Sequence, residues 1–471
     1  MLSKNFGSAQ PCVFLAAIAA YLLFAFYPSE LLHWVISLLS IVIVIVVFRT
    51  VPRFVQGLSA LFLLVGISLL LASGAAWPMF VTGFGNMLNI LSLFALIPLI
   101  ALPIELGNYA VRIQQMISRR IKGSGWLYTM TAGLSYILSS FMNIATLPMV
   151  YQTIRPSLEL FPIEQKERFI SRAITHGYSM PIVWTPVAPI VGIIVEMTGV
   201  QWSAILPIMV PFSILGLVLD AVMGQWIARR RLKQLDPAAV DELAAARQGD
   251  ERPVQDRPAS HPVHILAAIL VFTCLIALLE TYTHYSFLLL VSVAVVPFAL
   301  AWSLLIGAGR QFVRRGVAML PVQLLKMKEQ FIVFLSAGFM ISAIQTSGAG
   351  HVINAWIMAG KQVIGADLFL ILIPLIPLGL AFIGLHPAVG LALTAESLNP
   401  QAMGISPELT AIAMLTGAAT AFLMGPYNAT AGMMAHLTRQ SPIRISNWNA
   451  PFTLAYLMMA MILLIILKKV Y

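Results

Sequence analysis

Four short polar segments lie inside long apolar stretches of this 471-residue chain. Hydroxyl and amide oxygens, together with backbone N–H groups freed at helix ends, are the groups that hold a small solute or ion inside a membrane. We therefore interpret the polar residues of these segments and their prolines as a binding site for a substrate or ion. The residues are Ser140, Asn143, Thr146, Thr185, Pro186, His386, Pro426 and Asn428.

Three ionisable residues are candidates for proton coupling: His386, His176 and Glu396. An ionisable group inside a membrane is energetically unfavourable and usually faces a cavity. Histidine, moreover, exchanges protons near neutral pH. A structural role is the alternative for each residue. His386 would cap a half-helix, His176 would join two helices by a hydrogen bond, and Glu396 would lie near the outer surface.

The composition places these segments in a membrane. Hydrophobic residues make up 59% of the chain and charged residues only 10%, whereas soluble proteins carry about 25% charged residues. About eleven apolar stretches reach the roughly 20 residues that a transmembrane helix needs. The sequence thus predicts an all-α polytopic membrane protein with about eleven transmembrane helices. Cys12 and Cys274 lie in apolar spans and offer neither a disulfide framework nor a metal site.

Two of the apolar stretches, 127–152 and 366–398, have a polar turn at their middle. Such a turn predicts a re-entrant hairpin, because irregular backbone at membrane depth must be enclosed by protein or by a water-filled cavity. The stretches that follow them, 170–198 and 407–435, contain internal prolines. Proline removes a backbone donor, so we expect both helices to be broken.

The order of hairpin and broken helix occurs twice, which predicts an internal repeat. An offset of 240 residues places His176-Gly177 over Thr416-Gly417 and Pro186 over Pro426. The expected organisation has four parts: an extra N-terminal helix over 1–30, a first repeat over 31–230, a linker over 231–262 and a second repeat over 263–471.

The basic residues set the orientation, because Lys and Arg collect in cytoplasmic loops. With the N-terminus inside and both hairpins counted as re-entrant, all but Lys361, Lys468 and Lys469 of the 28 Lys and Arg residues lie inside. This arrangement gives the two repeats opposite topology, with the 231–262 linker in the cytoplasm and the C-terminus outside. The net charge of +10 then reflects topology in the inner membrane rather than a nucleic-acid partner.

Inverted repeats with broken helices at mid-membrane are typical of secondary transporters. Half-helix N-termini carry a partial positive charge that attracts anions, and unwound carbonyls can hold Na⁺. No phosphate-binding loop, His-Glu-x-x-His or Gly-x-Ser-x-Gly motif occurs. We therefore expect no enzyme activity and no cofactor beyond Na⁺ or H⁺ as the coupling ion.

The segment from Ser139 to Pro148 resembles the Ser-Asn-Thr hairpin signature of the divalent-anion/Na⁺ symporters, a family of the ion transporter superfamily. Residues 185–189 and 425–429 resemble the segments of that family's two broken helices. The resemblance implies a Na⁺ site near Asn143 and Thr185, a homodimer, and an elevator movement of a transport domain against a scaffold. His386 stands where the repeat expects Asn.

The leading hypothesis is a secondary active transporter that moves a small organic anion, such as a di- or tricarboxylate, coupled to Na⁺ or H⁺. One alternative on the same scaffold is a cation/proton antiporter or a metalloid efflux permease. Another is a membrane-embedded enzyme that acts on a lipid-linked substrate, with His386 or His176 as the base. The expected partners are the small substrate and the lipid bilayer.

Overall fold

The computed structural model describes residues 2–109, 112, 123–159, 161, 163–232, 261–351, 355, 359, 364–385, 387–397 and 404–470. Every regular element within these residues is a helix. Ten helices in this part of the chain are long and apolar enough to cross a membrane, and a further apolar helix over Gln10–Phe26 is slightly shorter. The prediction of an all-helical, multi-pass membrane protein with about eleven membrane helices is confirmed.

The first helices of the chain are mostly apolar and end at turns or prolines. Ser29 caps the second helix by accepting a hydrogen bond from Leu32 N (3.3 Å). Pro98 and Pro103 break a later helix into short pieces, because each removes a backbone donor. The elements are α1 (Leu2–Phe26), α2 (Glu30–Phe48), α3 (Arg53–Ala72), α4 (Met79–Thr82), α5 (Leu88–Leu96), the 3-10 helix η1 (Ile97–Ala101) and α6 (Leu102–Leu106).

The next elements form a helical hairpin, a broken helix and a long helix. The hairpin consists of two arms that meet at a tight turn, and the broken helix has an irregular segment rich in proline at its centre. The elements are α8 (Ser124–Met142), η2 (Asn143–Ala145), α9 (Thr146–Leu158), α10 (Lys166–Ser179), η3 (Pro181–Val183), α11 (Pro189–Thr198) and α12 (Trp202–Leu232). Most of the expected 231–262 linker lies outside the described residues.

The second half of the chain contains the same order of elements. One helix was not anticipated from the sequence: α16 carries Arg310, Arg314 and Arg315 and is too polar to count as a membrane span. The elements are α14 (Val263–Tyr282), α15 (Phe287–Leu305), α16 (Gly309–Lys326), α17 (Lys328–Ser347), α19 (Ala366–Leu372), α20 (Leu375–Phe382), α21 (Pro387–Ser397), α23 (Pro407–Met424), α24 (Ala429–Thr438) and α25 (Pro442–Leu467).

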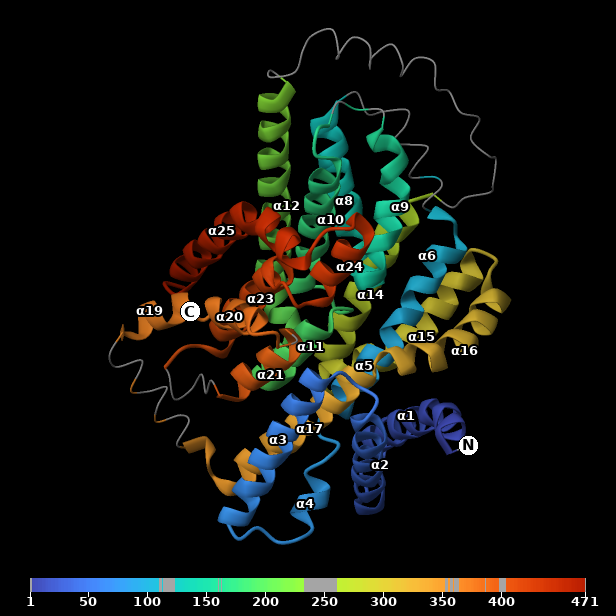
Figure 1. Ribbon diagram of the computed structural model, residues 1–471, viewed down its shortest axis with the longest axis vertical. Coiled ribbons are helices and arrows are strands. Elements are labelled where there is room, and N and C mark those ends of the chain that lie inside the picture. The colour runs from blue at the N-terminus through green and yellow to red at the C-terminus, as the bar shows by residue number, and fades with distance from the viewer. Residues whose placement is uncertain are drawn as a thin grey trace.

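Helices α3 and α17 pack side by side and run in the same direction (Figure 1). Their first turns border one cavity, which Phe54 and Glu329 both line. Further along, a Cβ on Gly66 would lie 2.7 Å from the Phe339 ring, so the two helices are still in close contact there. Both helices begin with a basic residue, Arg53 and Lys328, and the parallel packing puts these two ends together.

The two halves of the chain are interlocked through their broken helices. The second part of the first broken helix, α11, packs on α21, which is the second arm of the C-terminal hairpin. In the same way α24 packs on α9, the second arm of the N-terminal hairpin. Figure 1 shows α8, α9, α10 and α12 at one end of the long axis and α3, α4 and α17 at the other. The breaks lie between these ends.

Two glycines bring each broken helix against the backbone of its own hairpin. A Cβ on Gly177 in α10 would lie 2.1 Å from the Ala132 carbonyl oxygen in α8. A Cβ on Gly417 in α23 would lie 2.5 Å from the carbonyl oxygen of Pro374, between α19 and α20. A real Cβ does not fit at either place. These glycines are the pair that the 240-residue offset aligns, so the same close contact is built twice.

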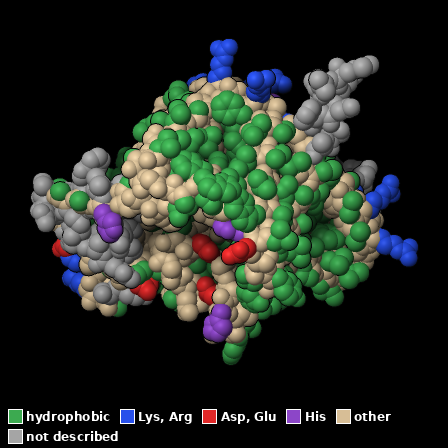
Figure 2. Space-filling model, turned by 90° about the horizontal axis from the view of Figure 1, so that it is seen from below, with side chains coloured by type: hydrophobic (Ala, Val, Ile, Leu, Met, Phe, Trp, Pro, Cys, Tyr) green, Lys and Arg blue, Asp and Glu red, His purple; other side chains and the backbone are tan. Residues whose placement is uncertain are grey.

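The outer surface is largely apolar. Large side chains such as Leu305 (88% exposed), Tyr282 (81%) and Leu31 (75%) have no protein cover. Figure 2 shows a face on which hydrophobic side chains predominate, while Lys and Arg lie near its edge. Exposed apolar surface of this extent requires a lipid environment, because monomeric soluble proteins rarely expose large contiguous apolar patches.

Candidate functional site

The tip of the first hairpin is a strained turn. α8 ends at Met142, and Asn143 has a positive φ of 46°, which residues other than glycine rarely adopt. Such strain is retained only when the surroundings hold it in place. Two hydrogen bonds from the broken helix do so here: Tyr178 Oη donates to Asn143 Oδ1 (2.9 Å) and Thr185 Oγ1 donates to the Ser140 carbonyl (2.8 Å).

The irregular segment of the first broken helix is fully packed. Pro181 begins a 3-10 turn and Pro189 begins α11, so the segment between them cannot form a regular helix. Residues 181–190, including Pro186, are all buried. Trp202 Nε1 donates to the Trp184 carbonyl (2.8 Å) and thereby satisfies one of the backbone groups that the break leaves free.

The second break is bridged by one side chain. The segment Gly425-Pro426-Tyr427 separates α23 from α24, and Asn428 lies at its end. Asn428 Oδ1 accepts from Ala431 N (2.7 Å) and caps α24, while Nδ2 donates to the Ala421 carbonyl (2.7 Å) in the last turn of α23. Asn428 therefore holds both half-helices in one geometry.

The first hairpin tip and the second break meet in a group that we name the tip cluster: Asn143, Thr146, Tyr178 and Thr430. Thr430, in the first turn of α24, lies beside the Tyr178 hydroxyl, and α24 packs on α9, which begins at Thr146. The Thr146 and Thr430 hydroxyls are buried, and the Thr146 hydroxyl has no hydrogen-bond partner within the described part of the chain. An unsatisfied buried hydroxyl beside two helix N-termini is suited to bind an anion or a small ion.

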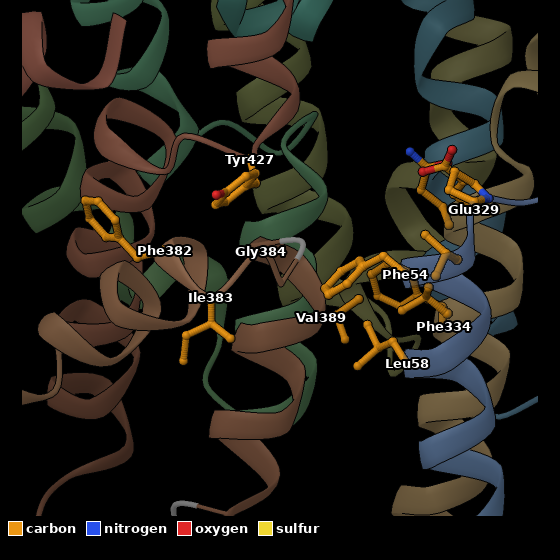
Figure 3. Close-up of a pocket in the computed structure, with 13 residues that line it drawn as sticks. Phe54, Leu58, Glu329, Phe334, Phe382, Ile383, Gly384, Val389 and Tyr427 are labelled. Carbon is orange, nitrogen blue, oxygen red and sulfur yellow. The ribbon is translucent and has the colours of Figure 1, made fainter. Parts of the chain in front are cut away.

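The second hairpin tip borders a cavity of about 670 Å³, a size typical of small-molecule sites. Gly384 forms the tip with φ +94°, and a Cβ there would touch Phe54 and Tyr427. Figure 3 shows Phe54, Leu58, Phe334 and Glu329 on one side and Ile383, Gly384, Val389 and Tyr427 on the other. Pro52, Val55, Gln330, Val333 and Phe382 complete the lining.

The cavity is apolar with a polar end. Glu329 is the charged residue in its lining, and Gln330 beside it has a buried Oε1 with no partner among the described residues. No Lys or Arg from the described part of the chain lines it. The cavity therefore suits a solute with an apolar body and a polar group.

The structure brings several of the expected site residues together. Two of them bond directly, Thr185 to the Ser140 carbonyl, and Asn143 bonds to Tyr178 of the same broken helix. Pro426 and Asn428 lie in the second break, which is adjacent to the cavity through Tyr427.

His386 lies outside the described residues, and the side chain of Glu396 is likewise not described. The Na⁺ site near Asn143 and Thr185 stays a prediction; Asn143 Oδ1 accepts one hydrogen bond from Tyr178, and Thr185 Oγ1 donates one to the Ser140 carbonyl.

The third ionisable candidate, His176, belongs to a buried cluster that the sequence did not reveal. We name it the His–Asp cluster: Tyr128, His176, Asp220 and Asn449, from α8, α10, α12 and α25. His176 Nδ1 lies 2.6 Å from Asp220 Oδ1, and His176 Nε2 lies 3.2 Å from Asn449 Oδ1. Asp220, a lone acidic residue within the apolar helix α12, was the available signal, because an intramembrane carboxylate is rarely without function.

Comparisons with known proteins agree with this architecture. The fold is similar to the crystal structure of the YdaH transporter of Alcanivorax borkumensis, with a TM-score of 0.58 and 15% sequence identity over 86% of this chain and 97% of that chain. This chain shares the fold of that membrane protein. No family model matches the sequence, and no curated protein matches it.

Proposed function

We propose that this protein is a secondary active transporter for a small organic anion, coupled to Na⁺ or H⁺. The observation that carries the proposal is the tip cluster. There, the first hairpin tip and the second break bring two helix N-termini together with the buried hydroxyls of Thr146 and Thr430, and the Thr146 hydroxyl has no partner among the described residues. Helix N-termini attract anions without a basic side chain, and discontinuous helices at a repeat interface are the usual transporter site.

The proposed topology has two repeats of opposite orientation. Two observations support it. The aligned glycines Gly177 and Gly417 make the same contact in each half, and the parallel helices α3 and α17 start together at Arg53 and Lys328, as the charge rule expects. Because α11 packs on α21 and α24 on α9, both hairpins and both broken helices would move as one transport domain.

An elevator movement of that domain is the proposed mechanism, with α3 and α17 as part of the scaffold. The cavity lies between these two helices and the second hairpin tip. Cysteines in place of Phe54 and Ile383, which line the cavity from opposite sides (Figure 3), should allow a bifunctional reagent to block transport. Unchanged transport in the cross-linked protein would contradict a movement at this boundary.

The function is tested by uptake into proteoliposomes with imposed Na⁺ and pH gradients, using dicarboxylates, citrate, sulfate, arsenite and amino acids. We expect a carboxylate to accumulate, and Thr146→Val or Asn143→Ala to reduce uptake by about tenfold or more, because each removes a polar group from the tip cluster. Thr281→Val is the control, since the Thr281 hydroxyl bonds only to its own helix at an exposed position. Accumulation of no compound by folded protein would contradict the proposal.

A second candidate cargo is an organic cation. Glu329 in the cavity favours it, because the described lining contains no basic residue. Tetraphenylphosphonium distinguishes the two cargoes: proton-driven export that depends on Glu329 would favour a cation/proton antiporter. Binding that is unaffected by Glu329→Gln would leave the anion as the cargo.

A further inference from the structure

The His–Asp cluster is a buried set of hydrogen-bonding groups in the helices around the first broken helix. His176, Asp220 and Asn449 are all fully buried, and Tyr128 is 4% exposed. Tyr128 Oη donates to Asp220 Oδ1 (2.8 Å), and the His176 ring stacks on Phe452 with centroids 4.2 Å apart. A buried carboxylate without a positive partner is strongly unfavourable, so the ionisation states of this cluster must be linked.

The acceptors around His176 fix its protonation state. Asn449 Nδ2 faces the Leu423 carbonyl (2.9 Å), which can only accept, so Asn449 Oδ1 must be the atom that faces His176. The Thr175 hydroxyl, which lies 2.8 Å from the Ser171 carbonyl, is also within 3.2 Å of that oxygen. His176 therefore has an acceptor at each ring nitrogen: Asp220 Oδ1 at Nδ1 and Asn449 Oδ1 at Nε2. With Asp220 ionised, only the doubly protonated imidazolium donates to both.

The charges around the ring come from several helices. Arg172, one turn earlier in α10, is buried, and its charge opposes protonation of His176, whereas the Asp220 carboxylate from α12 favours it. Tyr128 faces the pair from α8, whereas α25 contributes the uncharged Asn449 and Phe452. Asp220 Oδ2 is buried without a partner among the described residues, so it is a second position for a proton.

We propose that His176 and Asp220 form the binding site of the coupling proton and that this conformation has the proton bound. The inference rests on the proposed function and assigns its coupling ion. Binding forms an N–H bond on the imidazole lone pair with a proton from water, and release returns that proton to water.

Asn449 connects this proton site to the second break. If His176 loses the Nε2 proton, its lone pair faces Asn449 Oδ1, and the repulsion is relieved when the Asn449 amide turns over. Turning the amide breaks its bond to the Leu423 carbonyl, in the last turn of α23. That turn leads into Gly425-Pro426-Tyr427, and Tyr427 lines the cavity. The protonation state of His176 thus alters the geometry beside the cavity.

The proton site is tested first without any substrate, with the purified full chain in nanodiscs containing ¹⁵N-labelled histidine. NMR should show both ring nitrogens of His176 protonated at about pH 6 and one proton lost as the pH rises to about 9. His176→Gln assigns the signal, and Asp220→Asn should make the ring neutral where the wild-type ring is charged. His284→Gln, at an exposed position, is the control.

The second experiment uses the compound that accumulates in the uptake screen. His176→Gln and Asp220→Asn should reduce pH-gradient-driven uptake by about tenfold or more, while exchange of labelled for unlabelled compound without a gradient continues. Asn449→Ala should leave the titration of His176 visible and weaken the gradient-driven uptake. Loss of exchange together with uptake would indicate a structural role and contradict the inference.

The NMR titration and the uptake assay distinguish failure of the proposed transport function from failure of the proton site. If no compound accumulates, the proposed function fails, but the wild-type titration still decides whether His176 binds and releases a proton. A ring that keeps one protonation state across the whole range overturns the proton site, even if transport is found. Uptake that is driven by Na⁺ alone and is unchanged in His176→Gln overturns it as well.

Discussion

At the scale of single residues, Asn428 shows how one side chain can define a break. It caps α24 at Ala431 N and donates to the last turn of α23 at the Ala421 carbonyl. We expect Asn428→Ala to lower the stability by about 2–3 kcal/mol, because it removes a helix cap and also removes the amide donor that the Ala421 and Phe422 carbonyls share at the end of α23. Thermal unfolding in detergent measures this change.

Ser406→Ala is the matched control for that prediction. Ser406 Oγ caps α23 by accepting from Leu409 N (3.2 Å), and its side chain makes no second bond across a break in the described structure. Its loss should cost about 1 kcal/mol. If the two substitutions lower the melting temperature equally, Asn428 acts only as a cap and does not bridge the half-helices.

At the scale of elements, the close contacts at Gly177 and Gly417 set the spacing between each broken helix and its hairpin. We expect Gly177→Ala and Gly417→Ala each to destabilise the protein by about 1–3 kcal/mol, because the added Cβ would overlap a backbone carbonyl that cannot turn aside. The midpoint of thermal unfolding reports the effect.

Gly133→Ala tests whether any glycine in these helices would behave in the same way. Gly133 lies in α8 next to Ala132, and a Cβ there would meet nothing within 4 Å. Since alanine is the better helix former, this substitution should be neutral or stabilising by up to about 1 kcal/mol. Equal destabilisation at all three positions would show that the contacts at Gly177 and Gly417 are not special.

At the scale of the whole molecule, the proposed orientation can be tested at the two ends of α14. His261 and His284 flank this helix, and both side chains are exposed. In a background without Cys12 and Cys274, an impermeant maleimide should label His284→Cys in intact cells and label His261→Cys only after permeabilisation. The reverse pattern would invert the topology, and labelling of both would show that α14 does not cross the membrane.

The sequence was sufficient for the fold class, because composition and the length of apolar stretches depend on neither partners nor packing. The break that a proline causes in a helix likewise depends only on the local sequence, and the helices do end beside Met180-Pro181 and Gly425-Pro426. Apolar runs did not predict helix α16, because its apolar residues are interrupted by Arg310, Arg314 and Arg315. The site residues Asn143 and Thr185 could be named from their positions at interruptions, yet nothing in the sequence showed that Tyr178 joins one of these tips to Thr430.

The sequence by itself therefore determined that this is a helical membrane protein with a repeated pattern of interruptions. Only the tertiary structure decided which interruption meets which, because that depends on the packing of α24 on α9 and α11 on α21. The same holds for His176. Its two acceptors, Asp220 and Asn449, lie 44 and 273 positions away in sequence, and its protonation depends on a geometry that only the folded chain creates.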